Sequence, residues 1–186
     1  MVQRLNPYLV SVAILLSMAA YLLWVGRAPI CTCGYVRLWY GETGGSQNSQ
    51  HLTDWYSLTH VVHGLLLYAG IWLVARRLAF GWRLAIATLV EAAWEILENS
   101  DRIIERYRAV TVSQDYFGDS VINSVGDIAA MMLGFSLARV LPVRVSVVLA
   151  VIIEVLLAWT IRDGLVLNVL MLVWPLEAIR VWQAGG

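Results

Sequence analysis

Ionisable side chains gather in three apolar stretches of the sequence. His60 and His63 are three residues apart in the first stretch, so a helix would carry both on one face. The second stretch ends in E-A-A-W-E-I-L-E-N and the third begins with G-D-S-V-I-N-S-V-G-D. Helical spacing again places their polar residues on one face of each helix: Glu91, Glu95 and Glu98 in the second, and Asp119, Asn123 and Asp127 in the third.

These residues have the types needed for metal binding or for proton transfer. Two histidines with carboxylates from facing helices resemble the ligand supply of metal sites in helical bundles. We therefore expect His60, His63 and Glu95 as metal ligands, and zinc or iron would suit that donor set. A bound metal would activate water for hydrolysis, whereas the same groups without metal would form a proton relay or an acid/base pair. In both cases the catalytic candidates are Glu91, Glu95, Asp119, Asn123 and Asp127.

Each of these residues also has a purely structural interpretation. A histidine at a helix start, such as His60, is often an interfacial group, and Glu95 would pair with Arg102 or Arg106. The Asp/Asn face would hydrogen-bond to neighbouring helices. The coincidence of three polar faces favours a site, because charge at the centre of a membrane helix costs about 2.5–3.5 kcal/mol and usually faces the bundle interior for a functional reason.

The composition identifies the elements that must position these residues as membrane helices. The 186 residues are 60% hydrophobic and only 14% charged, against about a quarter charged in soluble domains. The mean hydropathy is +0.70. The formal net charge is zero, and all 13 basic residues are arginine, so no basic surplus indicates nucleic acid as a partner.

Apolar runs predict an all-α membrane protein, a bundle of about six transmembrane helices in a single integral-membrane domain over residues 1–186. A hydrocarbon core of about 30 Å takes about 20 helical residues. The first run is longer than a signal-peptide core and is interpreted as a retained anchor. The last two runs are joined only by R-D-G and predict a tight helical hairpin. The six predicted spans are 8–25, 58–75, 82–98, 120–139, 145–161 and 164–181.

The distribution of arginine favours cytoplasmic N- and C-termini. The short loops A-R-R-L and L-P-V-R hold arginine without any acid, as cytoplasmic loops do. Residues 26–57 and 99–118 then form outer-face loops, the first of them flexible, and the spacing of Glu98 and Arg102 predicts that the third helix extends beyond the bilayer. The antiparallel path brings all three polar faces into the outer leaflet, where we expect them to line a water-accessible cavity.

Two outer-face features add further candidates. Arg102 and Arg106 are placed to bind a lipid phosphate, with a solvated charged face as the alternative. Cys31 and Cys33 are too few for a disulfide framework or a complete zinc site, and their C-x-C spacing closes a small ring that disfavours a disulfide. The glycine after Cys33 indicates a turn, and an outer-face redox or metal role is the alternative.

Several motifs together resemble a family of small bacterial inner-membrane proteins. They are C-T-C-G-Y-V-R-L-W, Q-H-L-T-D-W-Y-S-L-T-H-V-V-H-G, W-E-I-L-E-N-S, G-D-S-V-I-N-S-V-G-D and I-R-D-G-L-V-L-N. The resemblance covers nearly the whole chain and implies a multi-pass protein of the bacterial inner membrane without an assigned activity. A looser similarity links Asp119, Asn123 and Gly126 to the D-x-x-x-N-x-x-G helix of VanZ-like membrane proteins, to which His63 and Asp127 are additions.

Three functions are compatible with these observations. The leading hypothesis is a membrane-embedded hydrolase or transferase that acts on a lipid or lipid-linked substrate at the outer leaflet. The first alternative is a small ion-coupled or proton-coupled transporter, which would need a polar path to the inner face, where Glu154 and Asn168 are isolated. The second alternative is a non-catalytic membrane assembly or stability factor. Membrane lipids are the expected partners in all three.

Overall fold

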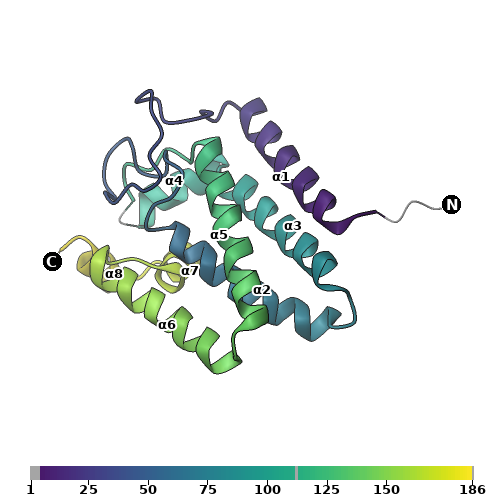
Figure 1. Ribbon diagram of the computed structural model, residues 1–186. Coiled ribbons are helices and arrows are strands. Elements are labelled where there is room, and N and C mark those ends of the chain that lie inside the picture. Colours follow the sequence, from purple (N-terminus) through teal and green to yellow (C-terminus); the bar gives the residue numbers. More distant parts are fainter. Residues whose placement is uncertain (1–4, 112, 186) are drawn as a thin grey trace.

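The computed structural model describes residues 5–111 and 113–185, and its regular structure in this part of the chain is helical (Figure 1). An isolated bridge between Tyr40 and Asp54 pairs two loop segments. The helices, in chain order, are α1 (Pro7–Trp24), α2 (Ser57–Ala75), α3 (Phe80–Glu98), α4 (Asp101–Val110), α5 (Val121–Val140), α6 (Val143–Thr160), α7 (Leu165–Val173) and α8 (Glu177–Gln183).

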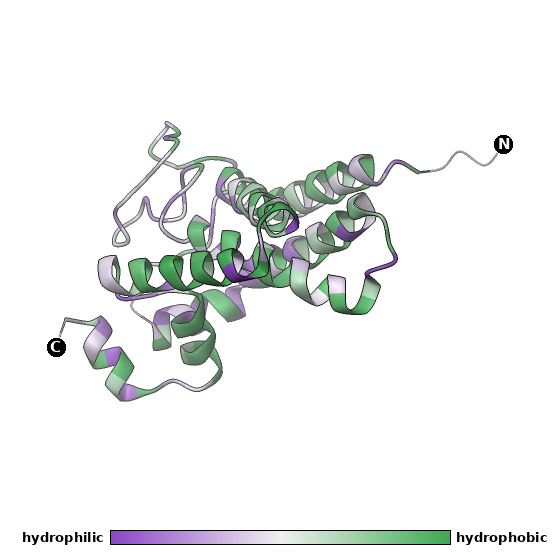
Figure 2. Ribbon diagram, turned by 60° about the horizontal axis from the view of Figure 1, so that its bottom comes forward, coloured by the Kyte–Doolittle hydropathy of each residue, from purple (hydrophilic) through white to green (hydrophobic). Residues whose placement is uncertain are grey.

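Four helices, α1, α2, α5 and α6, are long and apolar enough to cross a membrane. Helix α3 has the same length as α2 but carries Arg83 and three glutamates, so its composition alone does not qualify it. It packs against α1, α2 and α5 and buries Glu91 and Glu95. The green ribbons of Figure 2 show how far apolar residues cover these helices. The chain is therefore a membrane-type helical bundle.

The prediction of a single long helix over residues 164–181 is wrong, because two short helices replace it. Pro175 lies between α7 and α8 and cannot continue a helix. At 1.5 Å per residue, α7 rises about 14 Å, less than half of a hydrocarbon core of about 30 Å. Arg162 donates to the carbonyl of Trp182 (3.0 Å), and Gln183 donates to Asp163 (3.3 Å). The segment therefore returns to the end of α6 at which it started.

The two ends of the chain consequently lie at opposite ends of the bundle. Pro7, at the start of α1, packs against Gly81 at the start of α3. Gln183 contacts Asp163, which also accepts a hydrogen bond from Tyr56 just before α2. Figure 1 shows α1 and α8 on opposite sides of the bundle. The fold therefore does not confirm the prediction that both termini share one side, because the segment with α7 and α8 turns back to the end of α6.

The predicted extension of the third helix is also replaced by a separate helix. Helix α3 ends at Glu98, and Ser100 adopts the extended conformation of a helix N-cap (φ −77°, ψ 144°) before α4. The turn at Asn99 lets α4 pack on α7. The segment after α3, predicted as an outer-face loop, thus contains a helix of its own.

Helices α2 and α5 form the closely packed centre of the bundle. A Cβ atom on Gly64 would meet the carbonyl of Met131, and one on Gly134 would meet the carbonyl of Val61. Small residues at such a crossing let two helix backbones touch, as is common between membrane helices. Helix α6 covers the other side of α2, where Leu157 is fully buried.

The loop before α2 is hydrogen-bonded to the start of α5, although its sequence predicts flexibility. The N–H groups of Val121 and Ile122 donate to the carbonyls of Ala28 and Pro29 (2.8 and 3.2 Å). Ser120 donates its N–H to Ser49 (3.0 Å). The polar start of α5 is thereby held under this loop.

A disulfide joins Cys31 and Cys33, so the expectation that their spacing disfavours one is wrong. Gly34 adopts the left-handed region (φ +86°) and donates its N–H to the carbonyl of Cys31 (3.0 Å). The resulting turn brings the two Cα atoms to 5.1 Å, within the range that a disulfide bridges. The turn predicted from the glycine is present and makes the bond possible.

Candidate functional site

A histidine pair on α2 faces one carboxylate of α3. Nδ1 of His60 lies 2.6 Å from Oε1 of Glu91, and Nδ1 of His63 lies 2.8 Å from the same oxygen. The i, i+3 spacing on α2 puts both rings on the side turned toward α3. Glu91 is 2% exposed, and the side chain of His60 is 7% exposed. The triad is thus built from two adjacent helices inside the bundle.

Glu95, one turn further along α3, is fully buried, and neither of its carboxylate oxygens has a hydrogen-bond partner. Its Oε1 lies 3.6 Å from Nδ1 of His60. His60, Glu95 and Glu98 offer one ligand atom each within 4.8 Å of one another, as do His60, His63 and Glu91. A buried unpaired carboxylate is expensive, so this position calls for a proton or a cation.

Helix α5 supplies the opposite wall of the cluster. Oδ2 of Asp127 lies 3.9 Å from Nε2 of His60, and its Oδ1 accepts a hydrogen bond from Ser57 (2.7 Å). Asn123, one turn earlier on α5, donates to the carbonyl of His51 (2.9 Å) and to Asp54 (3.4 Å). The predicted Asp/Asn face of this helix therefore divides into two roles: Asp127 reaches the histidine, and Asn123 holds the loop before α2.

Asp119 belongs to a separate hydrogen-bond network at the same end of the bundle. It accepts hydrogen bonds from Asn99 (2.9 Å) and Tyr116 (3.0 Å), and its own N–H donates to Asn99 (2.7 Å). Burial raises the pKa of Asp119 to about 6 despite these donors. The network ties the end of α3 to the start of α5.

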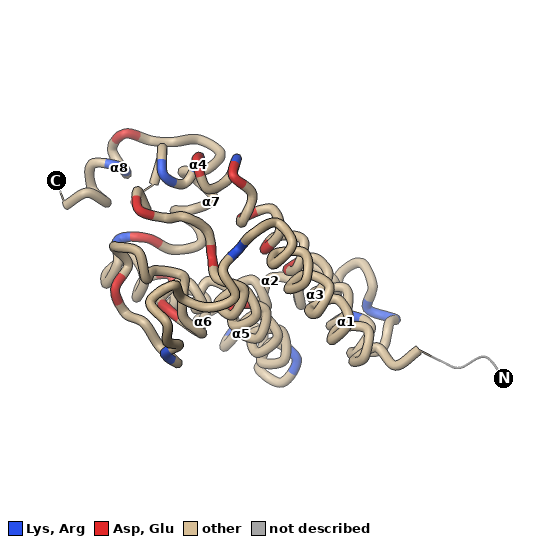
Figure 3. The backbone as a smooth tube through the Cα atoms, turned by 90° about the horizontal axis from the view of Figure 1, so that it is seen from above, with Lys and Arg blue, Asp and Glu red and all other residues tan. Residues whose placement is uncertain are grey.

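A cavity with about 620 Å³ of empty space, including its open mouth, joins the two groups. The acidic residues gather toward this end of the molecule, where α4 and α7 lie (Figure 3). The polar wall of the cavity offers imidazole, carboxylate, hydroxyl and amide groups. The polar lining residues are Asn48, Ser49, Tyr56, Thr59, His60, His63, Glu98, Tyr107, Ser113, Tyr116, Asp119, Asp127 and Asn168. Nothing basic other than histidine lines it within the described parts of the chain.

An apolar groove continues from the cavity between α2, α3 and α7. It has about 1410 Å³ of empty space, and it shares His63, Trp94, Leu165 and Val169 with the cavity. Its other lining residues are Leu66, Leu67, Val90, Glu91, Val166, Leu170 and Val173. The site therefore has a polar chamber and an apolar extension along α2, one of the four membrane-type helices.

Helix α7, which walls both spaces, is held at each end by an opposite charge. The carboxylate of Glu154 accepts hydrogen bonds from the N–H groups of Leu165 (3.1 Å) and Val166 (3.0 Å). The Nε and Nη2 atoms of Arg106 both donate to the carbonyl of Leu172 (3.1 and 3.0 Å). A negative charge at the N-terminus and a positive one at the C-terminus complement the helix dipole. Glu154, isolated in the sequence, is thus a helix cap.

The structure does not bring the two predicted substrate-binding arginines to the cavity. Arg106 is occupied with the C-terminal carbonyl of α7, and Arg102 is exposed on α4. Neither residue lines the cavity or the groove. By contrast, the predicted metal ligand His60 lies beside Glu95, and His63 is its neighbour on the same face of α2. The ligand atoms that converge form two sets, His60 with His63 and Glu91, and His60 with Glu95 and Glu98. The predicted trio is thus divided between two sets that share His60.

Several residues of the site were not singled out by the sequence analysis. Tyr56 and Asp163 are 107 residues apart and meet at 3.2 Å on one side of the cavity. Burial raises the pKa of Asp163 to about 6. Tyr107 and Tyr116 line the cavity from the outer segment. A polar loop has no periodicity from which such side chains could be recognised. Asp163, an acid in the short turn between two apolar runs, could have been recognised as a candidate.

The chain is similar to known bacterial proteins over most of its length. The family model described as "Protein of unknown function (DUF2585)" matches residues 22–185. A UPF0314 protein of Paracoccus denitrificans is 64% identical over 183 residues, covering 98% of this chain and 95% of the relative. A UPF0314 protein of Novosphingobium aromaticivorans is 53% identical over 176 residues, covering 92% and 89%.

The chain belongs to this family. Its resemblance to a bacterial membrane-protein family without an assigned activity is therefore confirmed. A UPF0314 protein of Sinorhizobium fredii is 53% identical over 161 residues, covering 87% of this chain and 82% of the relative. No solved structure matches.

Proposed function

We propose that this UPF0314 protein is a metal-dependent hydrolase or transferase, embedded in the bacterial inner membrane, that acts on a lipid or lipid-linked substrate. The observation that carries the proposal is Glu95, a fully buried carboxylate with both oxygens unpartnered beside His60. Within a bilayer such a group is costly and usually functional. A divalent cation would satisfy it.

The surrounding residues fit a zinc or iron ion. His60 belongs to both candidate ligand sets, the one with Glu95 and Glu98 and the one with His63 and Glu91. Imidazole and carboxylate donors suit both metals. Glu91 faces His60 and His63 together, as a carboxylate that orients ligand histidines does. Glu98 lines the cavity, so this side of the cluster is open to a substrate.

Asp127 is the best-placed general base. It lies across His60 from α3, lines the cavity and is oriented by the hydroxyl of Ser57. A metal at His60 would supply an acidified water, and the carboxylate of Asp127 would take its proton as the water attacks the substrate. The polar cavity would hold the substrate's reacting group next to both.

The apolar groove supports a lipid as the substrate. The groove runs along α2, a helix of membrane type, and joins the polar cavity at His63 and Trp94. One molecule with a polar head and a hydrocarbon tail would fill both spaces. Because hydroxyl, amide and carboxylate groups line the cavity and arginine does not within the described residues, a hydroxylated head fits better than a free phosphate.

An apolar core lies beyond the cluster of His60, Glu91 and Glu95, and it favours an enzyme over a transporter. The buried residues further along α2, α3 and α5 are apolar, among them Ile71, Leu84, Met131 and Phe135. Thr88 is also buried there, and its hydroxyl bonds to the carbonyl of Leu84 within its own helix. A transported ion would have to cross this layer without ligands.

Lipid analysis of cells tests the proposed function. In a bacterium deleted for its UPF0314 gene, the wild-type chain should restore the lipid profile that mass spectrometry records, and Glu95→Gln should leave the profile of the deletion strain. Glu105→Gln is a matched control, since Glu105 is exposed on α4. Immunoblots would confirm equal amounts in the membrane. Restoration by Glu95→Gln, or identical lipids in deletion and wild-type strains, would refute the proposal.

A further inference from the structure

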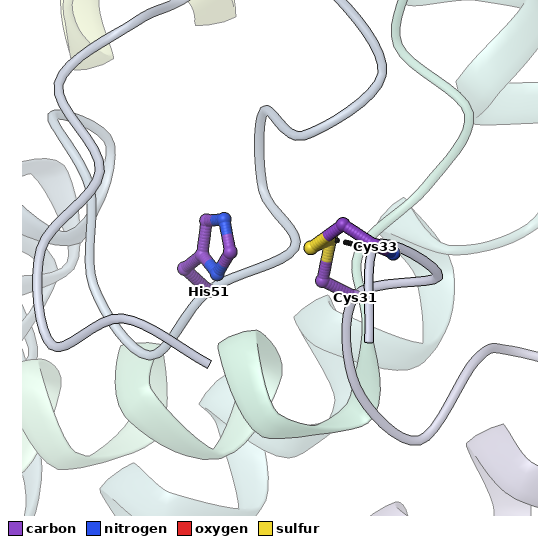
Figure 4. A group of neighbouring side chains, drawn as sticks. All are labelled: Cys31, Cys33 and His51. Carbon is purple, nitrogen blue, oxygen red and sulfur yellow. Dashed lines mark hydrogen bonds between the residues drawn. A yellow bond between two sulfur atoms is a disulfide. The ribbon is translucent and has the colours of Figure 1, made fainter. Parts of the chain in front are cut away.

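A second cluster of reactive side chains lies in the loop before α2. The sulfur atoms of Cys31 and Cys33 and a ring nitrogen of His51 lie within 4.8 Å of one another. Figure 4 shows the bonded sulfurs with the imidazole ring alongside. This cluster shares no residue with the cavity lining. The proposed lipid chemistry does not use it.

A disulfide at this spacing has little structural value. One residue separates the two cysteines, so the bond links no distant parts of the fold. In the chain-entropy view, a disulfide stabilises by restricting the unfolded chain, and the effect is smallest for the shortest loops. The turn is also held without the bond, by the N–H of Gly34 on the carbonyl of Cys31 and by the bonds from α5 to Ala28 and Pro29. A chemical role accounts better for the pair.

We propose that Cys31 and Cys33 form a redox-active centre. It exchanges its disulfide with the dithiol of a partner protein that approaches the loop before α2. The two sulfurs differ in exposure and in hydrogen bonding, as such an exchange requires. Cys31 is 2% exposed, whereas Cys33 is partly exposed. The backbone N–H of Cys33 donates to Sγ of Cys31 (3.2 Å). Cys33 is therefore the sulfur that a partner attacks, and Cys31 is the stabilised leaving group.

The exchange balances without another reactant. A thiolate of the partner attacks Sγ of Cys33, the bond between Cys33 and Cys31 breaks, and Cys31 leaves as a thiolate. The partner's second thiolate then attacks the partner sulfur of the mixed disulfide, closes the partner's own disulfide and releases Cys33. Two electrons pass from the partner to the pair, and the two thiol protons of the partner end on Cys31 and Cys33.

Aromatic and cationic side chains surround the imidazole ring beside the sulfurs. The guanidinium of Arg37 lies 5.3 Å from the ring centre of Tyr35, which stacks on His51. Burial, together with Arg37, lowers the pKa of His51, so a positive charge on this ring is disfavoured.

The ring of His51 serves to position the cluster. Its Nδ1 accepts the N–H of Arg37 (3.2 Å), and its Nε2 faces Oε1 of Gln47 (3.2 Å). With both nitrogens engaged by the chain, the imidazole is a spacer between the aromatic rings and the sulfurs. This distinguishes the cluster from a metal site, in which one nitrogen would be free for the ion.

The asymmetry of the two sulfurs gives the first test. In the full chain in detergent micelles, Cys31→Ser leaves the exposed thiol of Cys33, and Cys33→Ser leaves the buried thiol of Cys31. With 5,5′-dithiobis(2-nitrobenzoate) as the probe, Cys31→Ser should react at least about tenfold faster. Equal rates in the two cysteine variants would overturn the proposal.

Redox equilibrium of the wild-type chain gives the second test. In glutathione buffers that leave the disulfides of ribonuclease A intact, alkylation and mass spectrometry should show reversible reduction of the folded protein. Reduction only after thermal unfolding would identify a structural disulfide and overturn the proposal. So would tight binding of one Zn²⁺ or Cu⁺ by the reduced chain that His51→Gln abolishes, since the cluster would then be a metal centre.

Discussion

At the residue scale, the site is a set of ionisable groups whose partners are unequally distributed. Glu91 faces two histidines, Asp119 has a tyrosine and an amide, and Glu95 has no hydrogen-bond partner. A helix period predicts which residues share a face, so the sequence could place Glu91 and Glu95 beside His60. It could not predict which carboxylate is left unpaired, because that depends on side chains from other helices.

Asp163 provides a pH prediction at this scale. Burial raises the pKa of Asp163 to about 6 from its ordinary value near 4, so between these values the folded chain binds more protons than the unfolded chain. Stability must then fall as pH rises through this window, by up to about 1.4 kcal/mol per pH unit for this group. Thermal unfolding of Asp163→Asn in detergent should show a smaller loss of stability between pH 4 and pH 6 than the wild type. An equal loss of stability in Asp163→Asn and the wild type over this range would contradict the prediction.

At the scale of elements, the close crossing of α2 and α5 sets the position of His60 opposite Asp127. Apolar periodicity predicted both helices, but the approach of their backbones depends on Gly64 and Gly134, which meet only in the folded chain. The break between α7 and α8 was missed because an apolar run over 164–181 hides the effect of one proline. Hydropathy counts apolar residues and takes no account of a missing backbone donor.

Glycine substitutions test the crossing. Gly134→Ala should destabilise the protein by about 1–3 kcal/mol or more, because its methyl group would meet the backbone of Val61. Gly70→Ala is the matched control in α2, since a Cβ atom there meets nothing within 4 Å. It should be neutral or stabilise by up to about 1 kcal/mol. Thermal unfolding in detergent measures both, and an equal effect of the two substitutions would contradict the close crossing.

The charges at the two ends of α7 can be tested separately. Glu154→Gln weakens the cap on the N–H groups of Leu165 and Val166. Hydrogen exchange of α7 should then quicken, while that of α2 stays slow. Arg106→Gln should have the same effect from the other end, through the carbonyl of Leu172. If both variants leave exchange in α7 unchanged, the helix does not depend on these charges.

At the scale of the whole molecule, the fold places the loops, α4, α7 and the site at one end of the bundle. The membrane class and the convergence of three polar faces followed from hydropathy and antiparallel order. The sequence could not predict at which end of the bundle α8 lies, because that depends on whether the segment 164–181 crosses the bundle or turns back. Hydrogen bonds of Arg162 and Gln183 decide that it turns back.

Reporter fusions test this topology. With the N-terminus in the cytoplasm, alkaline phosphatase fused to the C-terminus should be active in the periplasm, and a fluorescent protein fused to the N-terminus should fold in the cytoplasm. The reason is that the described ends of the chain lie at opposite ends of the bundle. A folded fluorescent protein on the N-terminus together with an inactive phosphatase on the C-terminus would show that residues 164–181 cross the membrane after all.

The metal content of the purified chain tests most directly whether a cation satisfies Glu95 beside His60. Elemental analysis of protein purified without chelators should find about one zinc or iron per chain. Glu95→Gln and His60→Gln should lose that metal, while Glu105→Gln, on the exposed face of α4, should retain it. Wild-type protein that is free of metal and binds none when zinc or iron is added would contradict the account.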